Sequence, residues 1–292
     1  MKYKNYPLIL FFALVSTLNI FGAGGPDAYG YIWKASTDAG GPTYGWVDIV
    51  SRPSRVQVVG LSDDNSVGQF NIGFPFHYYW TDYSQIRVGS NGWVSFDNVS
   101  NIAHCFPTIP LAGGAADNYL APFMADLNFD GVGNPASVYY WTNNVDSFVI
   151  SYLNVPFWVN STPAYTGNNS FQVILAGADS SITFQYQDMD PSFLNNFGCN
   201  SDNVVGIENS TGAIGLQVSV EQMPADLLAI KFYYPDSVLI NVPDLKANWN
   251  QNVNSLGIFY PTGIVPLTGN IKNSGNVPII TSTSVTAQIQ NS

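Results

Sequence analysis

The sequence segment best suited to metal binding is Asp126-Leu-Asn-Phe-Asp-Gly131. Its oxygen-bearing side chains alternate before a glycine, as in the first half of an EF-hand calcium loop. An EF-hand needs a bidentate glutamate at the twelfth position, where this chain has Ser137, so the segment is not an EF-hand. Two interpretations stay open. Asp126, Asn128 and Asp130 either ligate calcium or hold a turn through hydrogen bonds.

A second acidic cluster lies earlier in the chain, at Asp63-Asp64-Asn65. Such residues either cap a turn or supply oxygen ligands to a calcium site. Calcium is the one cofactor that the sequence suggests.

Cys105 and Cys199 are the two cysteines of the chain. In an oxidising compartment, two cysteines form one disulfide; the alternative is two separate buried thiols. A catalytic cysteine needs an oriented base, and the two histidines, His77 and His104, do not suggest one.

No catalytic motif is present in this sequence. It has no G-x-S-x-G elbow, no H-E-x-x-H pair, no phosphate-binding glycine loop and no zinc-type cysteine quartet. Glu208 and Glu221 are the two glutamates, and neither lies in a context typical of a glycosidase carboxylate pair. We therefore predict that this region is not an enzyme.

The composition limits the partners. The net charge is −11, and only 10% of residues are charged, which argues against nucleic acid as a partner. Aromatic residues make up 14% of the chain and cluster at 74–80, 139–141 and 233–234. These rings either pack in the core or stack against carbohydrate. An extracellular protein or a glycan is the expected partner.

The first residues resemble a secretory signal. Lys2 and Lys4 precede an apolar stretch at Leu8–Val15 and small residues at 22–24. This order predicts a signal peptide over residues 1–23. No later segment has the roughly 20 apolar residues that a transmembrane helix needs. We expect a protein that is secreted, extracellular or at the cell surface, with no transmembrane segment after cleavage.

Short apolar or alternating runs recur between turn-forming clusters and predict strands. A β-sandwich is expected from many short strands at this spacing. The expected strands are Val56–Val59, Ile86–Gly89, Trp93–Phe96, Val138–Thr142, Phe148–Leu153, Phe171–Ala176, Ile182–Tyr186, Val204–Ile207, Ile214–Val220 and Leu228–Tyr234.

A domain boundary is expected near Pro235–Pro243. We predict a main β-sandwich domain over 24–236, a linker over 237–248 and a truncated immunoglobulin-like β-module over 249–292. Two strand-like runs in this last part, Gly263–Lys272 and Ile279–Ile289, are too few for a sandwich of about 100 residues. The sequence is therefore expected to be the N-terminal part of a larger protein.

Several segments resemble a nidogen-like (NIDO) extracellular domain over about residues 71–188. They occur in the family's order. These are Ile72-Gly-Phe-Pro-Phe-His-Tyr-Tyr-Trp80, Ile86-Arg-Val-Gly-Ser-Asn-Gly-Trp-Val-Ser-Phe96, Leu120-Ala-Pro-Phe-Met-Ala-Asp126, Ser137-Val-Tyr-Tyr140, Phe148-Val-Ile-Ser-Tyr-Leu-Asn-Val155 and Asn169-Ser-Phe-Gln-Val-Ile-Leu175.

The flanking parts carry two further resemblances. Leu267-Thr-Gly-Asn-Ile-Lys-Asn-Ser-Gly-Asn276 is similar to the first strands of a CARDB-like adhesion module. Gly25-Pro-Asp-Ala-Tyr-Gly-Tyr31 is similar to the N-terminal regions of large bacterial secreted surface proteins. These resemblances imply a non-catalytic extracellular or cell-surface module for adhesion or matrix assembly. The alternative is the accessory, carbohydrate-binding N-terminal region of a secreted hydrolase such as a protease or glycosidase.

Overall fold

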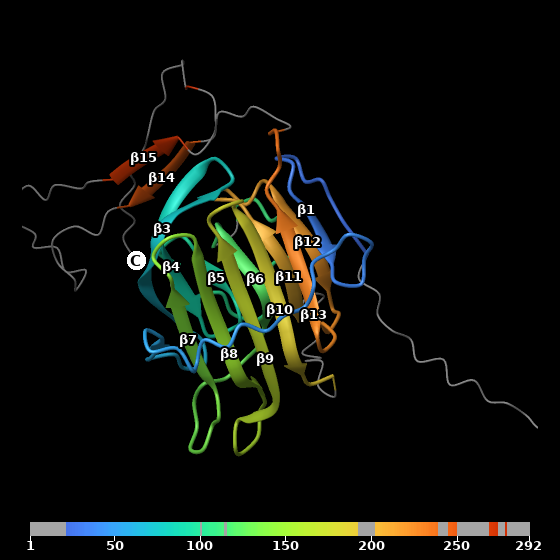
Figure 1. The fold of residues 1–292 in the computed structure, drawn as a ribbon. Coiled ribbons are helices and arrows are strands. Elements are labelled where there is room, and N and C mark those ends of the chain that lie inside the picture. The colour runs from blue at the N-terminus through green and yellow to red at the C-terminus, as the bar shows by residue number, and fades with distance from the viewer. Residues whose placement is uncertain are drawn as a thin grey trace, which may run out of the picture.

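The protein is a sandwich of two antiparallel β-sheets packed face to face (Figure 1). A computed structural model describes residues 22–99, 101–113, 116–191, 202–238, 245–249, 269–273 and 278. The described residues contain strands and connections but no helix. The predicted all-β sandwich is confirmed.

Seven strands form the first sheet. In spatial order they are β1 (Ile32–Ala35), β13 (Leu228–Tyr233), β10 (Ser181–Met189), β9 (Tyr165–Ala176), β8 (Ser147–Trp158), β7 (Ser137–Thr142) and β2 (Val56–Val58).

Six strands form the second sheet. In spatial order they are β12 (Gly215–Val220), β11 (Asn203–Glu208), β6 (Tyr119–Ala125), β5 (Val94–Ser95), β4 (Thr81–Gly89) and β3 (Ser66–Tyr78). A separate two-stranded sheet pairs β14 (Leu245–Trp249) with β15 (Gly269–Asn273).

Every run predicted as a strand of the main domain overlaps a strand of the structure, whereas β1, β3 and β6 were not predicted. Pro75 in β3 and Pro122 in β6 explain part of the difference, because proline argues against a central strand. β3 lies at a sheet edge, where proline is tolerated. Pro122 lies where the β6–β11 register shifts.

The core lies between the two sheets and is rich in aromatic side chains. Phe76, Phe123, Tyr152 and Phe171 are among its fully buried members. The hydroxyl of Tyr152 lies 2.9 Å from the carbonyl oxygens of both Gly89 and Trp93 in the opposite sheet. The hydroxyl of Tyr152 is thus satisfied by backbone of the six-stranded side of the sandwich.

A second, smaller apolar cluster covers the outer face of the six-stranded sheet. Val99, Ile102, Phe106 and Ile109 come from the connection between β5 and β6 and pack with Trp93 and with side chains of β6 and β11. Both faces of β6 are therefore buried, which explains why its sequence does not alternate.

The outer face of the seven-stranded sheet is crossed by the segment between β1 and β2, drawn in blue in Figure 1. Two buried glutamine amides hold this segment. Gln172 accepts from Val47 N at 3.2 Å and donates to Val47 O at 2.6 Å. Gln185 makes the same pair of bonds with Gly45, at 2.7 and 2.9 Å.

Several predictions concern residues outside the described part of the chain. The predicted signal peptide lies there up to residue 21, as do most of residues 249–292 and the expected strand Ile279–Ile289. β15 overlaps the expected run Gly263–Lys272. Within the described residues, no helix has the length and apolar character of a membrane span.

Candidate metal site

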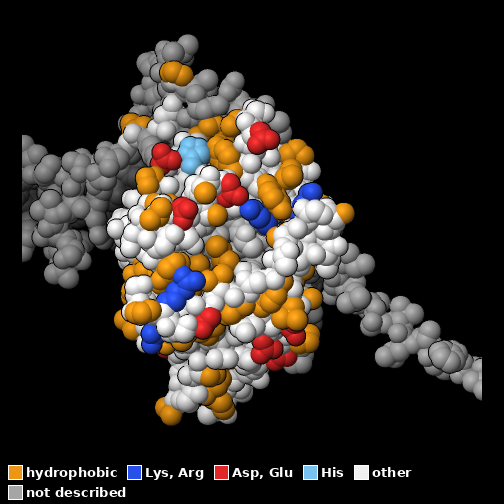
Figure 2. Space-filling view, viewed as in Figure 1, with side chains coloured by type: hydrophobic (Ala, Val, Ile, Leu, Met, Phe, Trp, Pro, Cys, Tyr) orange, Lys and Arg blue, Asp and Glu red, His pale blue; other side chains and the backbone are white. Residues whose placement is uncertain are grey.

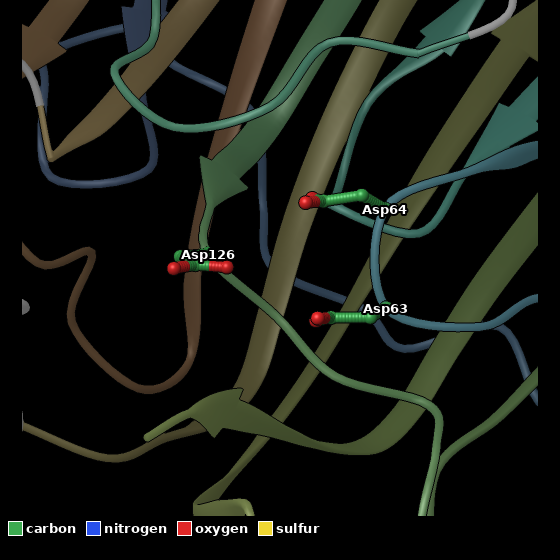
Figure 3. A group of neighbouring side chains, drawn as sticks. All are labelled: Asp63, Asp64 and Asp126. Atoms are coloured by element: carbon green, nitrogen blue, oxygen red, sulfur yellow. The ribbon is translucent and has the colours of Figure 1, made fainter. Parts of the chain in front are cut away.

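Three aspartates from two distant parts of the chain meet at one end of the sandwich. Asp63 and Asp64 lie in the connection between β2 and β3, and Asp126 directly follows β6 (Figure 3). One carboxylate oxygen from each residue lies within 4.8 Å of the others. Figure 3 shows the side chains of Asp63 and Asp64 directed toward Asp126.

The turn that carries Asp63 and Asp64 is held by its neighbours. Asn65 Oδ1 accepts from Ser62 N at 2.9 Å, and its amide donates to Gly60 O at 2.8 Å. The hydroxyl of Ser90 donates to the carbonyl of Asp63 at 2.5 Å. Asn65 therefore shapes the turn, which leaves the two aspartates to face Asp126.

Asn91 joins the two halves of the site. Its side-chain amide donates to Asp64 Oδ1 at 2.8 Å, and its Oδ1 accepts from Leu127 N at 3.0 Å. Asn91 is completely buried. The Asn91-Gly92 pair is recognisable in the sequence as a turn, but its link to the acidic cluster is visible only in the structure.

Two carboxyl groups of this site, Asp63 and Asp126, have a raised pKa. Burial, followed by the charges of Asp64 and Asp130, raises the pKa of Asp63 to about 6. Burial, followed by the charges of Asp64 and Asp63, raises the pKa of Asp126 to about 6. Asp63 Oδ1 is buried and has no hydrogen-bond partner among the described residues.

The other two predicted calcium ligands lie in the turn that follows Asp126. Asn128 Oδ1 accepts from Asp130 N at 2.7 Å, and its amide donates to Ala164 O at 2.7 Å. Asp130 Oδ2 accepts from Asp63 N at 3.2 Å. These two side chains hold the turn and attach it to the neighbouring loop, and the calcium set Asp126, Asn128 and Asp130 stays a prediction.

The side chains of His104 and Asp202 are in contact beside the site. The distance between His104 Nε2 and Asp202 Oδ1 is 2.5 Å, and both residues act on the pKa of Asp126 through their charges. Cys105 follows His104, while Cys199 lies outside the described residues. The predicted disulfide between Cys105 and Cys199 therefore stays a prediction.

Fold and site together define a two-sheet β-sandwich with a carboxylate cluster where its loops meet, an arrangement suited to holding a cation. A family model described as NIDO related matches residues 39–231, and the chain belongs to this nidogen-related family. The family consists in general of non-enzymatic domains and is typically extracellular. No curated protein and no solved structure matches the chain.

The family match extends the resemblance seen in the sequence on both sides. It begins in the segment that crosses the seven-stranded sheet and ends within β13, so it includes both Asp63-Asp64 and Asp126. The resemblances to a CARDB-like module and to bacterial surface proteins stay predictions.

Proposed function

We propose that this chain is a non-catalytic extracellular module for adhesion or matrix assembly, and that calcium bound by Asp63, Asp64 and Asp126 stabilises the end of its sandwich. The observation that carries the proposal is the approach of one carboxylate oxygen from each of the three aspartates to within 4.8 Å of the others, and Asp63 also has a buried oxygen that lacks a hydrogen-bond partner among the described residues. A secreted protein meets calcium in its surroundings, which suits such a site.

A cation would offset an electrostatic cost of this arrangement. Carboxylates brought together and partly buried repel one another and lose hydration. Among the described residues, no lysine, arginine or histidine forms an ion pair with Asp63 or Asp64. Burial and then the neighbouring carboxylates raise the pKa of Asp63 and Asp126 to about 6, and a bound cation would offset both of these costs.

The donor types favour calcium. All three side chains offer oxygen, the donor that calcium and magnesium prefer. The ligands come from connections between strands, and calcium accepts irregular geometry with six to eight oxygens, whereas magnesium requires a near-ideal octahedron. Backbone carbonyls and water would complete the coordination.

The site would connect three parts of the fold. It would fix the β2–β3 connection to the end of β6, and the hydrogen bond from Asp63 N to Asp130 extends this connection to the loop between β6 and β7. That loop is one of two that project beyond the end of the sandwich (Figure 1). Calcium would therefore order a surface on which a partner could dock.

Thermal unfolding at millimolar calcium and in EDTA tests the proposal. A ligand at 100 times its dissociation constant stabilises a fold by about 2.7 kcal/mol, which corresponds to a Tm rise of several degrees for a domain of this size. Asp64→Asn keeps an acceptor for Asn91 while it removes a charge, and we expect it to abolish the calcium response. Asp82→Asn is the matched control, because Asp82 is 67% exposed and pairs with His77 away from the site. An unchanged wild-type Tm at millimolar calcium would overturn the site.

A further inference from the structure

A hollow of about 500 Å³ opens on the outer face of the seven-stranded sheet, where β1 pairs with β13. Its lining includes Pro26, Ile32, Lys34, Tyr233 and Asp236. It lies apart from the aspartates of the candidate metal site, which do not contribute to the lining. A volume of this size is within the range of small-molecule and cofactor sites.

The alternation of side chains along β1 and β13 determines which residues point toward the hollow. Trp33 and Phe232 point into the core, with exposed fractions of 5% and 0%. Their neighbours Ile32 and Tyr233 point outward instead, and the two are directly opposite partners in the β1–β13 ladder. Together they place an aliphatic and an aromatic side chain next to each other at the hollow.

The neighbouring aromatic residue is held in a rigid cluster. Tyr234 packs against Tyr29 and Tyr31, with ring centroids 5.7 and 5.6 Å apart, and its hydroxyl contacts that of Tyr29. Tyr29 and Tyr31 are buried. The wall that Tyr234 contributes is therefore fixed before any ligand arrives, which lowers the entropy cost of binding.

The hollow also has both hydrogen-bond donors and hydrogen-bond acceptors. Lys34 Nζ, the carboxylate of Asp236 and the hydroxyl of Tyr233 form no hydrogen bond or ion pair with other described residues. The nearby Lys231 differs, because its Nζ is bound to Asp179 at 3.0 Å and lies 5.2 Å from the centroid of the Tyr233 ring. A donor, an acceptor and a hydroxyl are thus available around an apolar surface.

The other two aromatic clusters noted in the sequence lie outside the lining of the hollow. The guanidinium of Arg52 lies 3.8 Å from the centroid of the Trp141 ring, and Trp141 Nε1 donates to Ser54 Oγ at 2.9 Å. In the run 74–80, Phe76 and Tyr78 are at most 1% exposed. Tyr233, by contrast, points outward and lines the hollow, so its ring can stack against a ligand there.

We propose that this hollow binds a neutral sugar residue of an extracellular glycan. A pyranose presents a C–H face that can pack on Tyr233 and Ile32, and hydroxyl groups that both donate and accept. Lys34 and Asp236 would meet those hydroxyls, and because their charges are opposite they favour neither an anionic nor a cationic sugar. Hydrophobic, basic and acidic side chains lie side by side on this face of the molecule (Figure 2). The proposal rests on the extracellular interaction role proposed above and gives it a glycan partner.

Affinity electrophoresis of the full chain through gels that contain soluble neutral polysaccharides tests this proposal. The probes are β-glucan, xylan and mannan, with polygalacturonate as the anionic comparison. We expect at least one neutral polysaccharide to retard the wild type, and Tyr233→Ala to lower the affinity at least tenfold. Asp236→Ala changes an exposed side chain, so it tests the site without a risk to the fold, and we expect a severalfold loss. Tyr139→Ala is the matched control, because Tyr139 lies on β7, outside the lining.

Three outcomes would overturn the sugar site. They are an absence of retardation by all neutral polysaccharides, an equal loss in Tyr139→Ala and Tyr233→Ala, and retardation by polygalacturonate alone that salt abolishes. Calcium-dependent stabilisation of the same samples separates this failure from failure of the metal site. A chain that calcium stabilises but no neutral glycan retards keeps the candidate metal site and loses the sugar site.

Discussion

Asn91 donates a hydrogen bond from its buried side-chain amide to Asp64 Oδ1, across 2.8 Å. The same side chain accepts from the backbone of Leu127, next to Asp126. One neutral residue thus orients a carboxylate of the candidate metal site and fixes the chain beside another. Its position couples the integrity of the six-stranded sheet to the geometry of the acidic cluster.

Replacing Asn91 with alanine is expected to cost about 1–3 kcal/mol of stability, because the buried Leu127 N–H loses its acceptor. The calcium-induced rise in Tm should shrink in the same variant, since Asp64 is no longer oriented. Chemical denaturation with and without calcium measures both effects. Asn168→Ala is the control, because Asn168 donates an equivalent 2.8 Å bond to the exposed Asp188, while its Oδ1 accepts no hydrogen bond from a described residue. Equal losses in the two variants would contradict the assigned role of Asn91.

Gly92 is expected to tolerate no side chain. Its φ is +69°, and a Cβ there would lie 2.0 Å from the carbonyl oxygen of Phe123. Gly92→Ala should therefore cost more than the roughly 1–3 kcal/mol of backbone strain alone, because the backbone near Phe123 must also shift. Gly113→Ala is a close control: φ is +77° and nothing lies within 4 Å of the added atom. Equal losses of stability in Gly92→Ala and Gly113→Ala, measured by denaturant unfolding, would refute the steric part of this prediction.

Glu208 is expected to make stability depend on pH. Burial, opposed by the hydrogen bond from Leu111 N, raises the pKa of this carboxyl to about 8 from an ordinary 4.5. Between these values the folded chain holds a proton that the unfolded chain releases, so stability falls as pH rises. Glu208→Gln keeps the acceptor for Leu111 and should flatten the decline of Tm between pH 5 and pH 8. Glu221→Gln, at an exposed position, should follow the wild-type curve. An unchanged slope in Glu208→Gln would count against the prediction.

The predicted disulfide between Cys105 and Cys199 should stabilise the connection between β5 and β6, which packs on the outer face of the six-stranded sheet. The contact between the side chains of His104 and Asp202 brings the chain next to Cys105 close to the strand that begins at Asn203. We expect Cys105→Ser to lose about 2–5 kcal/mol, measured by denaturation. A reducing agent should destabilise the wild type by a similar amount and leave the variant unchanged. A wild type that does not respond to reduction would contradict the bridge.

Much of the fold could be predicted from the sequence because strand signals are local. The alternation of Ile182, Phe184 and Tyr186 and the turn chemistry of Asn91-Gly92 lie within a few residues of chain. β6 could not be recognised in this way, since both of its faces are buried and its side chains do not alternate. β1 has four residues, too few for alternation to distinguish it from a loop.

The acidic residues also show what the sequence predicts and what it does not. Their types and spacing in the sequence marked both Asp63-Asp64 and Asp126 as oxygen donors, but they are more than sixty positions apart. Only the register of the six-stranded sheet, with Asn91 between the two loops, brings their carboxylates within 4.8 Å. The hollow beside Tyr233 likewise depends on the pairing of β1 with the distant β13. By itself, the sequence determined the β class and which side chains offer carboxylate oxygens, because these follow from residue types and their near neighbours. The tertiary structure decided which of these carboxylates lie close together, because strand pairing brings together residues that are far apart in the chain.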